Sequence, residues 1–347
     1  MRKKILLLLL ISLTAVSCDL LGIGTSGPLG VVKTVDGGGT WLTKNAVQGG
    51  GDIANVRFYE MAFDPTSTER IFAATDKGLL ESDDSAESWK QLLSKVVAYD
   101  FMINPRDNKN IFVAGIFGDH GKIIRTRDGG TTWEEVYNEA SSNNPVETIT
   151  ANPNNPAEIY AALFSGTLIK SIDGGTNWFV LNDLGGPAIR LRYRNGIYAL
   201  VSNKGLSKSS DGGLHFNSLT NSLTGSGSAS SIIPTYIDGF FKLGLDDQTN
   251  GVIYLTTSAG LYKTTNDGQS WLLIKLPVDP DSSDKPRAIA STHGGMIAYT
   301  SVGSTFFKTL DGGKSWQTQG FPSNNVANKI LIDPVLNQIT YAGLSSR

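Results

Sequence analysis

Apolar and polar positions alternate in short runs along most of this chain, and the clearest example lies between residues 146 and 181. Residues 147–150 alternate as a strand, residues 158–163 form a more apolar strand, and residues 167–170 and 178–181 form two more. Turns rich in Asn, Pro and Gly separate these runs. Short β-rich runs bounded by such residues are typical of strands. The segment therefore predicts one unit of four antiparallel strands.

The same unit recurs along the chain, and each copy carries an eight-residue motif between its third and fourth strands. The clearest copy, residues 126–133, reads TRDGGTTW. The third positions of the seven copies are Asp36, Asp84, Asp128, Asp173, Asp211, Asn266 and Asp311, and the last positions are Trp41, Trp89, Trp133, Trp178, Phe216, Trp271 and Trp316. Repeats of about 45 residues that each supply a four-stranded sheet describe a β-propeller. We predict an all-β fold, a seven-bladed β-propeller of four-stranded antiparallel blades.

The two ends of the repeat region are complementary. The region begins with a third strand at residues 31–34, followed by its motif, and it finishes with a first strand at residues 329–334 and a second strand at residues 338–342. Joined in one sheet, these pieces make one complete blade. Such closure removes the unpaired strand edges of an open sheet. We therefore expect one propeller domain over residues 31–347, closed by its N- and C-terminal strands.

The motif itself has a structural explanation. Its Asp accepts hydrogen bonds from backbone N–H groups of the same turn, and its Gly pair supplies positive φ without a Cβ penalty. The Ser or Thr hydroxyls at the first and seventh positions are expected to hold the same turn. All six tryptophans of the chain occupy the last position, where the ring is expected to cover the seam to the next unit. We interpret the motif as a staple, because catalysis needs one converging constellation and not seven equivalent turns.

The first residues carry the features of an export signal. Residues 2–4 are basic, residues 5–13 are apolar, and small residues lead to Cys18, the only cysteine of the chain. This pattern predicts a lipoprotein signal peptide over residues 1–17, and then a lipidated Cys18 and a tether over residues 18–30. The alternative is an ordinary secretory signal with an incidental cysteine. We expect an exported bacterial lipoprotein, anchored to a membrane by lipid on Cys18 and facing the periplasm or the cell surface.

The motif also carries a family resemblance. The pattern [Ser/Thr]-x-Asp-x-Gly-x-[Thr/Ser]-Trp resembles the Asp-box, also called the bacterial neuraminidase repeat. The longer cycle, an apolar strand, Asp/Asn-Pro and then Ile-Tyr/Phe-Ala-Ala, resembles propellers of the sortilin type and the xyloglucanase type over residues 31–342. Its single-propeller size also resembles the photosystem II assembly and stability factors, some of which are lipoproteins. The resemblance is specific for fold and weak for function, since one fold hosts many activities.

Two departures bear on the enzymes that this resemblance implies. Sialidases open an arginine triad with Phe/Tyr-Arg-Ile-Pro, whereas this chain has only ERIF at residues 69–72, where Arg70 is expected to start a strand. Xyloglucanase-type enzymes resemble two propellers that clasp a glycan with an acidic residue from each, and this chain has one. Glycoside hydrolysis needs two carboxyl groups that face each other, and no spacing in this sequence identifies such a pair. We predict no catalytic residue.

The net charge and the acidic loops give little further information about function. The formal net charge is −2, and nothing suggests the clustered basic surface of a nucleic-acid-binding protein. Asp279, Asp281 and Asp284 form an acidic loop, and residues 246–251 look like half of a calcium loop, but the loop with the three aspartates lacks the Gly and the distal Glu of a calcium site. We interpret the first as solvated charge and the second as a turn, and we predict no metal and no cofactor.

We expect a ligand to meet the face formed by the loops between blades and between second and third strands. The first set of loops covers residues 45–57, 137–145, 217–239, 276–287 and 319–328, and the second set includes residues 115–121. The longest connection, residues 217–239, is rich in Ser, Thr and Gly. Loops of that length without structure of their own are often functional or disordered.

Three groups near this face are candidate binding residues. Arg190 and Arg192 share one side of an inner strand and can bind a carboxylate or a phosphate; the alternative is that they line a wet channel and pair with acids. Asp119 and His120 can act as an acid–base pair, and the alternative is an exposed loop histidine without a role. The last group is Tyr236, Phe240 and Phe241, of which at least one is expected to face the channel mouth.

These observations favour a lipid-anchored propeller that works as a non-catalytic binding or assembly scaffold, like the photosystem II assembly factors or sortilin in fold. The alternative is a carbohydrate-active protein, either a divergent glycoside hydrolase or a surface glycan binder. We expect a monomer whose protein or glycan partner docks on the loop face. Aromatic residues and acids gathered on one side of the channel would favour the glycan, and a mouth of mixed Ser, Asn and Thr would favour the scaffold.

Overall fold

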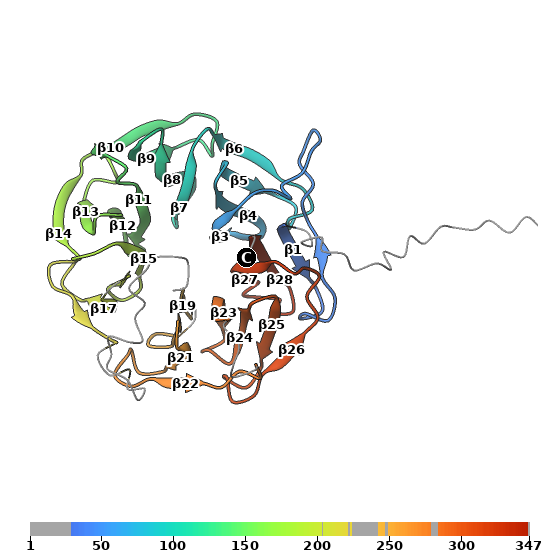
Figure 1. The fold of residues 1–347 in the computed structure, drawn as a ribbon. Coiled ribbons are helices and arrows are strands. Elements are labelled where there is room, and N and C mark those ends of the chain that lie inside the picture. Colours follow the sequence, from blue (N-terminus) through green and yellow to red (C-terminus); the bar gives the residue numbers. More distant parts are fainter. Residues whose placement is uncertain are drawn as a thin grey trace, which may run out of the picture.

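The chain folds into a ring of seven four-stranded antiparallel sheets around a central channel (Figure 1). A computed structural model describes residues 29–202, 204–220, 223, 242–246, 249–278 and 284–345. Every regular element in these ranges is a β-strand. The predicted all-β propeller of seven blades is confirmed. None of the described residues forms a helix long and apolar enough to cross a membrane.

Each blade runs outward from the channel in four strands. The first strands are β3 (Phe58–Asp64), β7 (Val97–Asn104), β11 (Val146–Asn152), β15 (Ala188–Tyr193), β19 (Leu243–Leu245), β23 (Pro286–Thr292) and β27 (Val326–Ile332). The second strands are β4 (Ser67–Thr75), β8 (Asp107–Phe117), β12 (Asn155–Leu163), β16 (Ile197–Val201), β20 (Ile253–Thr257), β24 (Ile297–Val302) and β28 (Thr340–Ser345).

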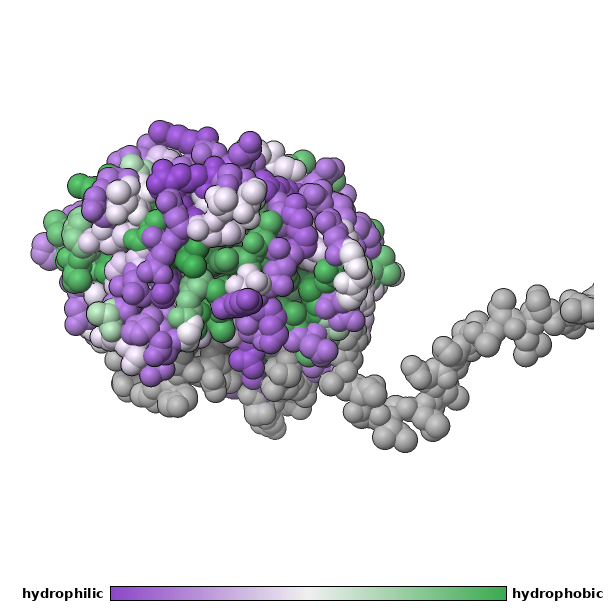
Figure 2. Space-filling view, turned by 90° about the horizontal axis from the view of Figure 1, so that it is seen from above, coloured by the Kyte–Doolittle hydropathy of each residue, from purple (hydrophilic) through white to green (hydrophobic). Residues whose placement is uncertain are grey.

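In the outer half of each blade the third strand is mostly buried and the fourth strand is the most exposed of the four. The third strands are β5 (Gly78–Ser82), β9 (His120–Thr126), β13 (Thr167–Ser171), β17 (Gly205–Ser209), β21 (Gly260–Thr264), β25 (Thr305–Thr309) and β1 (Gly30–Thr34). The fourth strands are β6 (Lys90–Ser94), β10 (Glu134–Ser142), β14 (Phe179–Asp183), β18 (Asn217–Ser218), β22 (Leu272–Ile274), β26 (Gln317–Gln319) and β2 (Leu42–Thr43). Figure 2 shows a side of the ring where hydrophilic residues cover most of the surface and hydrophobic residues form patches between them.

The ring closes as the sequence predicts. Strand β1 pairs antiparallel with β28, with Val32 opposite Ala342, and the complete blade has the order β2-β1-β28-β27. The hydrophobic cores lie between blades. In one of them, Tyr160 and Leu168 of one blade pack with Leu191 and Ile197 of the next. Burying apolar side chains between neighbouring sheets is what holds the blades together.

The eight-residue motif forms the predicted turn. In residues 126–133, Asp128 Oδ1 accepts the Thr132 N–H at 2.9 Å and the Thr126 hydroxyl at 2.8 Å. The Thr132 hydroxyl donates to Asp128 Oδ2 at 2.6 Å, and Thr126 Oγ1 accepts the Gly130 N–H at 2.9 Å. Both Gly129 and Gly130 have positive φ, which a side chain would disfavour.

The expectation about the motif's last aromatic is wrong in direction, because the ring covers the seam to the preceding unit. Trp133 Nε1 donates to Leu92 O at 3.2 Å, and Leu92 belongs to β6 of the preceding blade. The cause is that the whole turn packs against the preceding blade. A Cβ added to Gly130 would lie 3.1 Å from the Leu92 side chain.

Two connections are shorter than predicted. Residues 115–121 and 137–145 were expected to be loops, but β8 runs to Phe117, β9 starts at His120 and β10 runs to Ser142. The reason is continued pairing, since Ser142 still lies opposite His120 across two register shifts. The loops at these two places are therefore shorter than the sequence predicts.

Candidate functional site

The channel wall is built by one structural feature that repeats around the ring. In six blades the pairing of the first and second strands shifts register near its start, which is the mark of a β-bulge. In the remaining blade, Lys242 stands at the equivalent position, where its backbone N–H donates to Thr256 Oγ1 at 2.8 Å. The residues just after the shift form what we call the inner ring: Glu60, Asp100, Thr148, Arg190, Lys242, Ala288 and Lys329.

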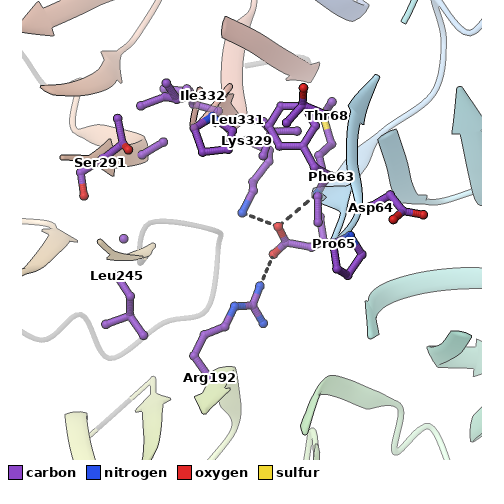
Figure 3. A pocket seen from close by; sticks show the side chains of 18 of the residues that line it. Phe63, Asp64, Pro65, Thr68, Arg192, Leu245, Ser291, Lys329, Leu331 and Ile332 are labelled. Carbon is purple, nitrogen blue, oxygen red and sulfur yellow. Dashed lines mark hydrogen bonds and ion pairs between the residues drawn. The ribbon is translucent and has the colours of Figure 1, made fainter. Parts of the chain in front are cut away.

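Opposite charges of the inner ring meet across the channel. Glu60 Oε2 lies 2.7 Å from Arg190 Nη2 and 2.8 Å from Arg192 Nη2. The Lys329 ammonium pairs with Glu60 Oε1, and Figure 3 shows Arg192 and Lys329 pointing toward the same carboxylate. Asp100 Oδ2 lies 3.0 Å from Arg190 Nη1 and 3.4 Å from Arg192 Nη1. We call these five residues the channel network.

The channel network keeps the carboxylate of Glu60 ionised. The Glu60 side chain is 2% exposed, and this burial alone would raise its pKa. The charges of Arg190, Lys329 and Arg192 outweigh burial and hold the pKa of Glu60 well below its ordinary value. For Arg190, burial would lower the pKa, but Glu60 and Asp100 raise it above the usual range.

Asp100 is held by further donors. Its Oδ2 accepts the Thr148 hydroxyl at 2.7 Å and the Ile149 N–H at 3.1 Å, so this fully buried carboxylate has both ionic and neutral partners. Buried charges are stable in proteins when they are paired and hydrogen-bonded in this way. Both carboxylates of the channel network are thus engaged by cations of the channel wall.

The structure places Arg190 and Arg192 together, in the alternative role that the sequence left open: they line the channel and pair with acids. Sequence reasoning missed their partners, Glu60 and Asp100. A signal was present, because both acids stand at the same distance before the turn that ends their inner strand, in YEMAFDP (59–65) and DFMINP (100–105). Alignment of the inner strands against one another would have found them.

A second group lies at the bulge positions themselves. The rings of Tyr59 and Tyr99 pack edge to face, with centroids 5.0 Å apart. Glu147 stands at the same position in the next blade, and no described residue gives its carboxylate a hydrogen bond or an ion pair. Burial raises the pKa of Glu147 to about 7, against the opposing charge of Arg190 and with help from Asp100. Burial and the charge of Glu147 in turn raise the pKa of Tyr99 to about 12.

A cavity of about 810 Å³ opens on the channel at the other end of the first strands. Figure 3 shows its wall, where Arg192 and Lys329 lie near the apolar side chains of Leu245 and Leu331. Residues of the turns after β3 and β27, such as Pro65 and Pro334, complete the lining. This opening lies away from the loops between blades, where we expected a ligand.

The remaining candidates lie apart from the channel or outside the described residues. His120 Nδ1 is 2.9 Å from Glu139 O, and its Nε2 is 3.4 Å from Asp119 Oδ1. The two residues thus belong to the β8–β9 hairpin, and neither contacts the channel network. Cys18, Tyr236 and Phe240, with Phe241, Asp279 and Asp281, lie outside the described residues.

Of the two segments weighed as calcium loops, residues 246–251 form a turn where they are described, while Asp279 and Asp281 of the other lie outside the described residues. The Asp246 carboxylate accepts the N–H groups of Thr249 at 2.8 Å and Gly295 at 2.7 Å, so it organises a turn. Within the described ranges, no group of three or more His, Cys, Asp or Glu side chains is arranged to hold a metal ion. Arg70 was compared above with the first arginine of the sialidase triad. It lies in β4 and pairs with Asp64 at 3.1 Å and with Glu81.

Comparison with known proteins supports the fold. No family model and no curated protein matches this chain. Among solved structures, a GH74 xyloglucanase from Xanthomonas campestris is 16% identical, with a TM-score of 0.62 over 90% of this chain and 50% of that one. A structure of YCF48 bound to D1 peptide is 15% identical, with a TM-score of 0.61 over 84% and 93%.

A third similar structure is the extracellular domain of a putative hybrid two component system from B. thetaiotaomicron, 13% identical, with a TM-score of 0.57 over 86% of this chain and 39% of that one. This chain thus spans about half the length of the xyloglucanase and most of the length of YCF48. At these identities the likeness shows a seven-bladed β-propeller and leaves the activity open.

Proposed function

We propose that this protein is a non-catalytic scaffold that binds a segment of a partner protein at the central channel. One observation carries the proposal: a single guanidinium, that of Arg190, binds both Glu60 and Asp100. Glycoside hydrolysis requires one protonated carboxyl group and one free carboxylate on either side of a substrate. Here both acids lie against the same cation. They support the channel wall and are not available as acid and nucleophile.

The comparisons agree with this choice in one respect. The chain matches about half of the xyloglucanase but 93% of YCF48, which is described in complex with a peptide. The similarity is one of fold, so the peptide itself is not transferred.

The large cavity suggests what the partner segment looks like. Its wall combines apolar side chains, such as Leu245 and Leu331, with more cations than acids: Arg192, Arg194 and Lys329 against Glu60 and Asp64. Pockets that bind specifically are mostly apolar with a few placed polar groups. A segment with apolar side chains on either side of an acidic residue fits this wall. We further propose that the protein reaches its partner as an exported lipoprotein held at a membrane by Cys18, in keeping with the extracellular neighbour.

A blocking substitution tests the channel. In Ala290→Arg a long side chain enters the large cavity from β23. The matched control, Ala140→Arg, adds the same side chain on the exposed face of β10. Full-length protein purified in detergent would be exposed to an array of peptides from exported and membrane proteins. We expect capture of peptides with an apolar-acidic-apolar pattern, at least tenfold weaker with Ala290→Arg and unchanged with Ala140→Arg.

The same preparation would be incubated with plant, host and bacterial glycans, and released reducing ends would be measured. Hydrolysis of any glycan by the wild-type protein would refute a non-catalytic role. Equal peptide capture by both arginine variants would show that the peptide does not bind at the channel.

One observation favours a second function, a glycan binder. Tyr59 and Tyr99 present two aromatic rings beside Glu147, and these aromatic and acidic groups lie on one side of the channel. Retention of the protein on an immobilised glycan, without hydrolysis, would support it. Retention should then fall at least tenfold in Tyr99→Ala and stay unchanged in Ala290→Arg, because the tyrosines and the large cavity are separate sites.

A further inference from the structure

A second, much smaller cavity lies at the waist of the channel. Its volume is about 20 Å³, enough for one particle of the size of a water molecule. Three of its lining residues are cations of the inner ring: Arg190, Lys242 and Lys329. Asn328 adds an amide, and apolar side chains complete the wall: Leu243, Ile289 and Ile330. No carboxylate lines this cavity, which we call the waist site.

The charges that the described residues place around the waist site do not balance. Arg190, Arg192 and Lys329 pair with Glu60, and the two arginines also pair with Asp100. Lys242 belongs to the same ring, but no described residue forms an ion pair with its ammonium group. Among the described residues, these four cations therefore have only two carboxylates as ion-pair partners. Surplus charge that is shielded from water is costly unless a counter-charge joins it.

We propose that the waist site binds one small monovalent anion, either free chloride or the carboxylate group of a bound ligand. The three cations supply the attraction and the amide of Asn328 supplies a neutral donor. The volume admits a single atom or the end of a carboxylate and excludes sulfate and phosphate. Burial and the charge of Arg190 lower the pKa of Lys242 to about 8, which is the response of an ammonium group that lacks its counter-ion.

The two sources of the anion share one place. The waist site and the 810 Å³ cavity have Leu243, Ile289, Lys329 and Ile330 in common. A ligand in the large cavity can thus place a carboxylate in the waist site, and chloride can fill it otherwise. The inference is independent of the proposed scaffold role, since chloride binding needs no partner protein.

The test measures chloride binding directly. The ³⁵Cl NMR line width would be recorded with full-length protein in detergent while chloride replaces methanesulfonate at constant ionic strength. We expect saturable broadening, which formate reverses by competition. Lys242→Met should weaken chloride binding at least tenfold, whereas Lys314→Met, on the exposed motif turn of residues 309–316, should not change it. Far-UV circular dichroism checks that each variant is folded.

A second variant tests the waist site without removing any of its cations. Asn328→Asp places a carboxylate in the waist site, so it should abolish the broadening and raise the melting temperature in chloride-free buffer. Absent broadening with no thermal shift by formate overturns the proposal, and so does broadening of equal size in Lys242→Met. A thermal shift with formate, absent in Lys242→Met, without chloride broadening supports the proposal with a ligand carboxylate as the anion.

Discussion

Arg190 Nη2 lies 2.7 Å from Glu60 Oε2, although the strands that carry the two residues are separated around the ring by two other blades. The contact therefore spans the channel and does not follow the wall. It joins parts of the ring that share no hydrophobic core. Ion pairs of this kind fix how distant elements sit relative to one another, provided that each charge keeps its partner.

The first prediction concerns this contact. Arg190→Met leaves Glu60 and Asp100 with fewer counter-charges in a buried place, and breaking a buried pair from one side costs about 3–5 kcal/mol. We expect the free energy of unfolding in urea to fall by that amount. Arg127→Met is the control, because the Arg127–Glu134 pair is exposed and such pairs contribute about 0–1 kcal/mol. Equal losses in the two variants would mean that the channel network is not a structural element.

The contact also shows where sequence reasoning stops. The seven motifs and the complementary ends predict the ring, because each is a local pattern that recurs. The match of Glu60 with Arg190 depends on the register of two inner strands, and a bulge sets that register in each. Without the bulge, the neighbouring residue Tyr59 would face the channel, since side chains alternate along a strand. Within one strand no local sign marks such a shift, although aligning the inner strands with one another brings Glu60 and Asp100 to the same position.

The arginines illustrate the same limit. Their spacing places Arg190 and Arg192 on one side of an inner strand, as the structure confirms, because that inference needs only the alternation within one strand. What they bind is decided by residues from other blades, which the spacing cannot identify. The length of β10 was missed for a related reason, since its last residues are polar and exposed and their pairing with β9 gives no apolar signal.

The second prediction uses the ionisation of Glu147. Its pKa of about 7 lies above the ordinary value of a glutamate, because burial disfavours the charge. The folded protein thus holds a proton that the unfolded chain releases, and stability should fall as pH rises from about 4.5 to 7. Glu147→Gln should remove this slope and stabilise the protein at pH 8 by on the order of 1–3 kcal/mol. Urea unfolding at several pH values measures both effects.

The control for Glu147 is Glu69→Gln, which makes the same change at an exposed position. We expect the wild-type slope between these pH values to persist in Glu69→Gln. A slope that also persists in Glu147→Gln would assign the titration to another group.

The third prediction concerns acid stability and the motif. The hydroxyl and the N–H of Thr132 hold the pKa of Asp128 below its usual range. A lowered carboxyl pKa stabilises the fold above the unfolded value of about 3.9, and this stabilisation is lost as pH falls further. Asp128→Asn should therefore take up about one proton fewer on unfolding between about pH 5 and pH 2, as shown by a flatter slope of stability against pH.

The chain holds its own control for this substitution. Asn266 occupies the same motif position, where its Oδ1 accepts the Ser270 N–H at 3.0 Å and its Nδ2 donates to Ser270 Oγ at 2.9 Å. The amide thus reproduces the turn without a charge. Asn266→Asp should steepen the acid slope by the amount that Asp128→Asn flattens it. If both variants follow the wild-type curve, the motif carboxylates do not control acid unfolding.

The fourth prediction concerns the motif copy at residues 82–89, which has lost its Gly pair. Ser85 and Ala86 stand there with φ of 60° and 68°, a conformation that costs a residue with a Cβ roughly 1–2 kcal/mol. The hydrogen bonds of the turn survive, since Ser88 N–H still donates to Asp84 Oδ1 at 2.9 Å. The copy is therefore strained but intact.

Ser85→Gly should relieve this strain. The Lys33 ammonium bonds to the backbone carbonyl of Ser85 at 2.9 Å, and the substitution keeps that contact. Glycine also gains freedom in the unfolded chain, so we expect a net stabilisation of about 0.5–1 kcal/mol. Ser94→Gly makes the same change at the end of β6, where φ is not positive, and should destabilise by a similar amount. Thermal unfolding measures both, and a loss of stability in Ser85→Gly would show that its side chain contributes more than the strain removes.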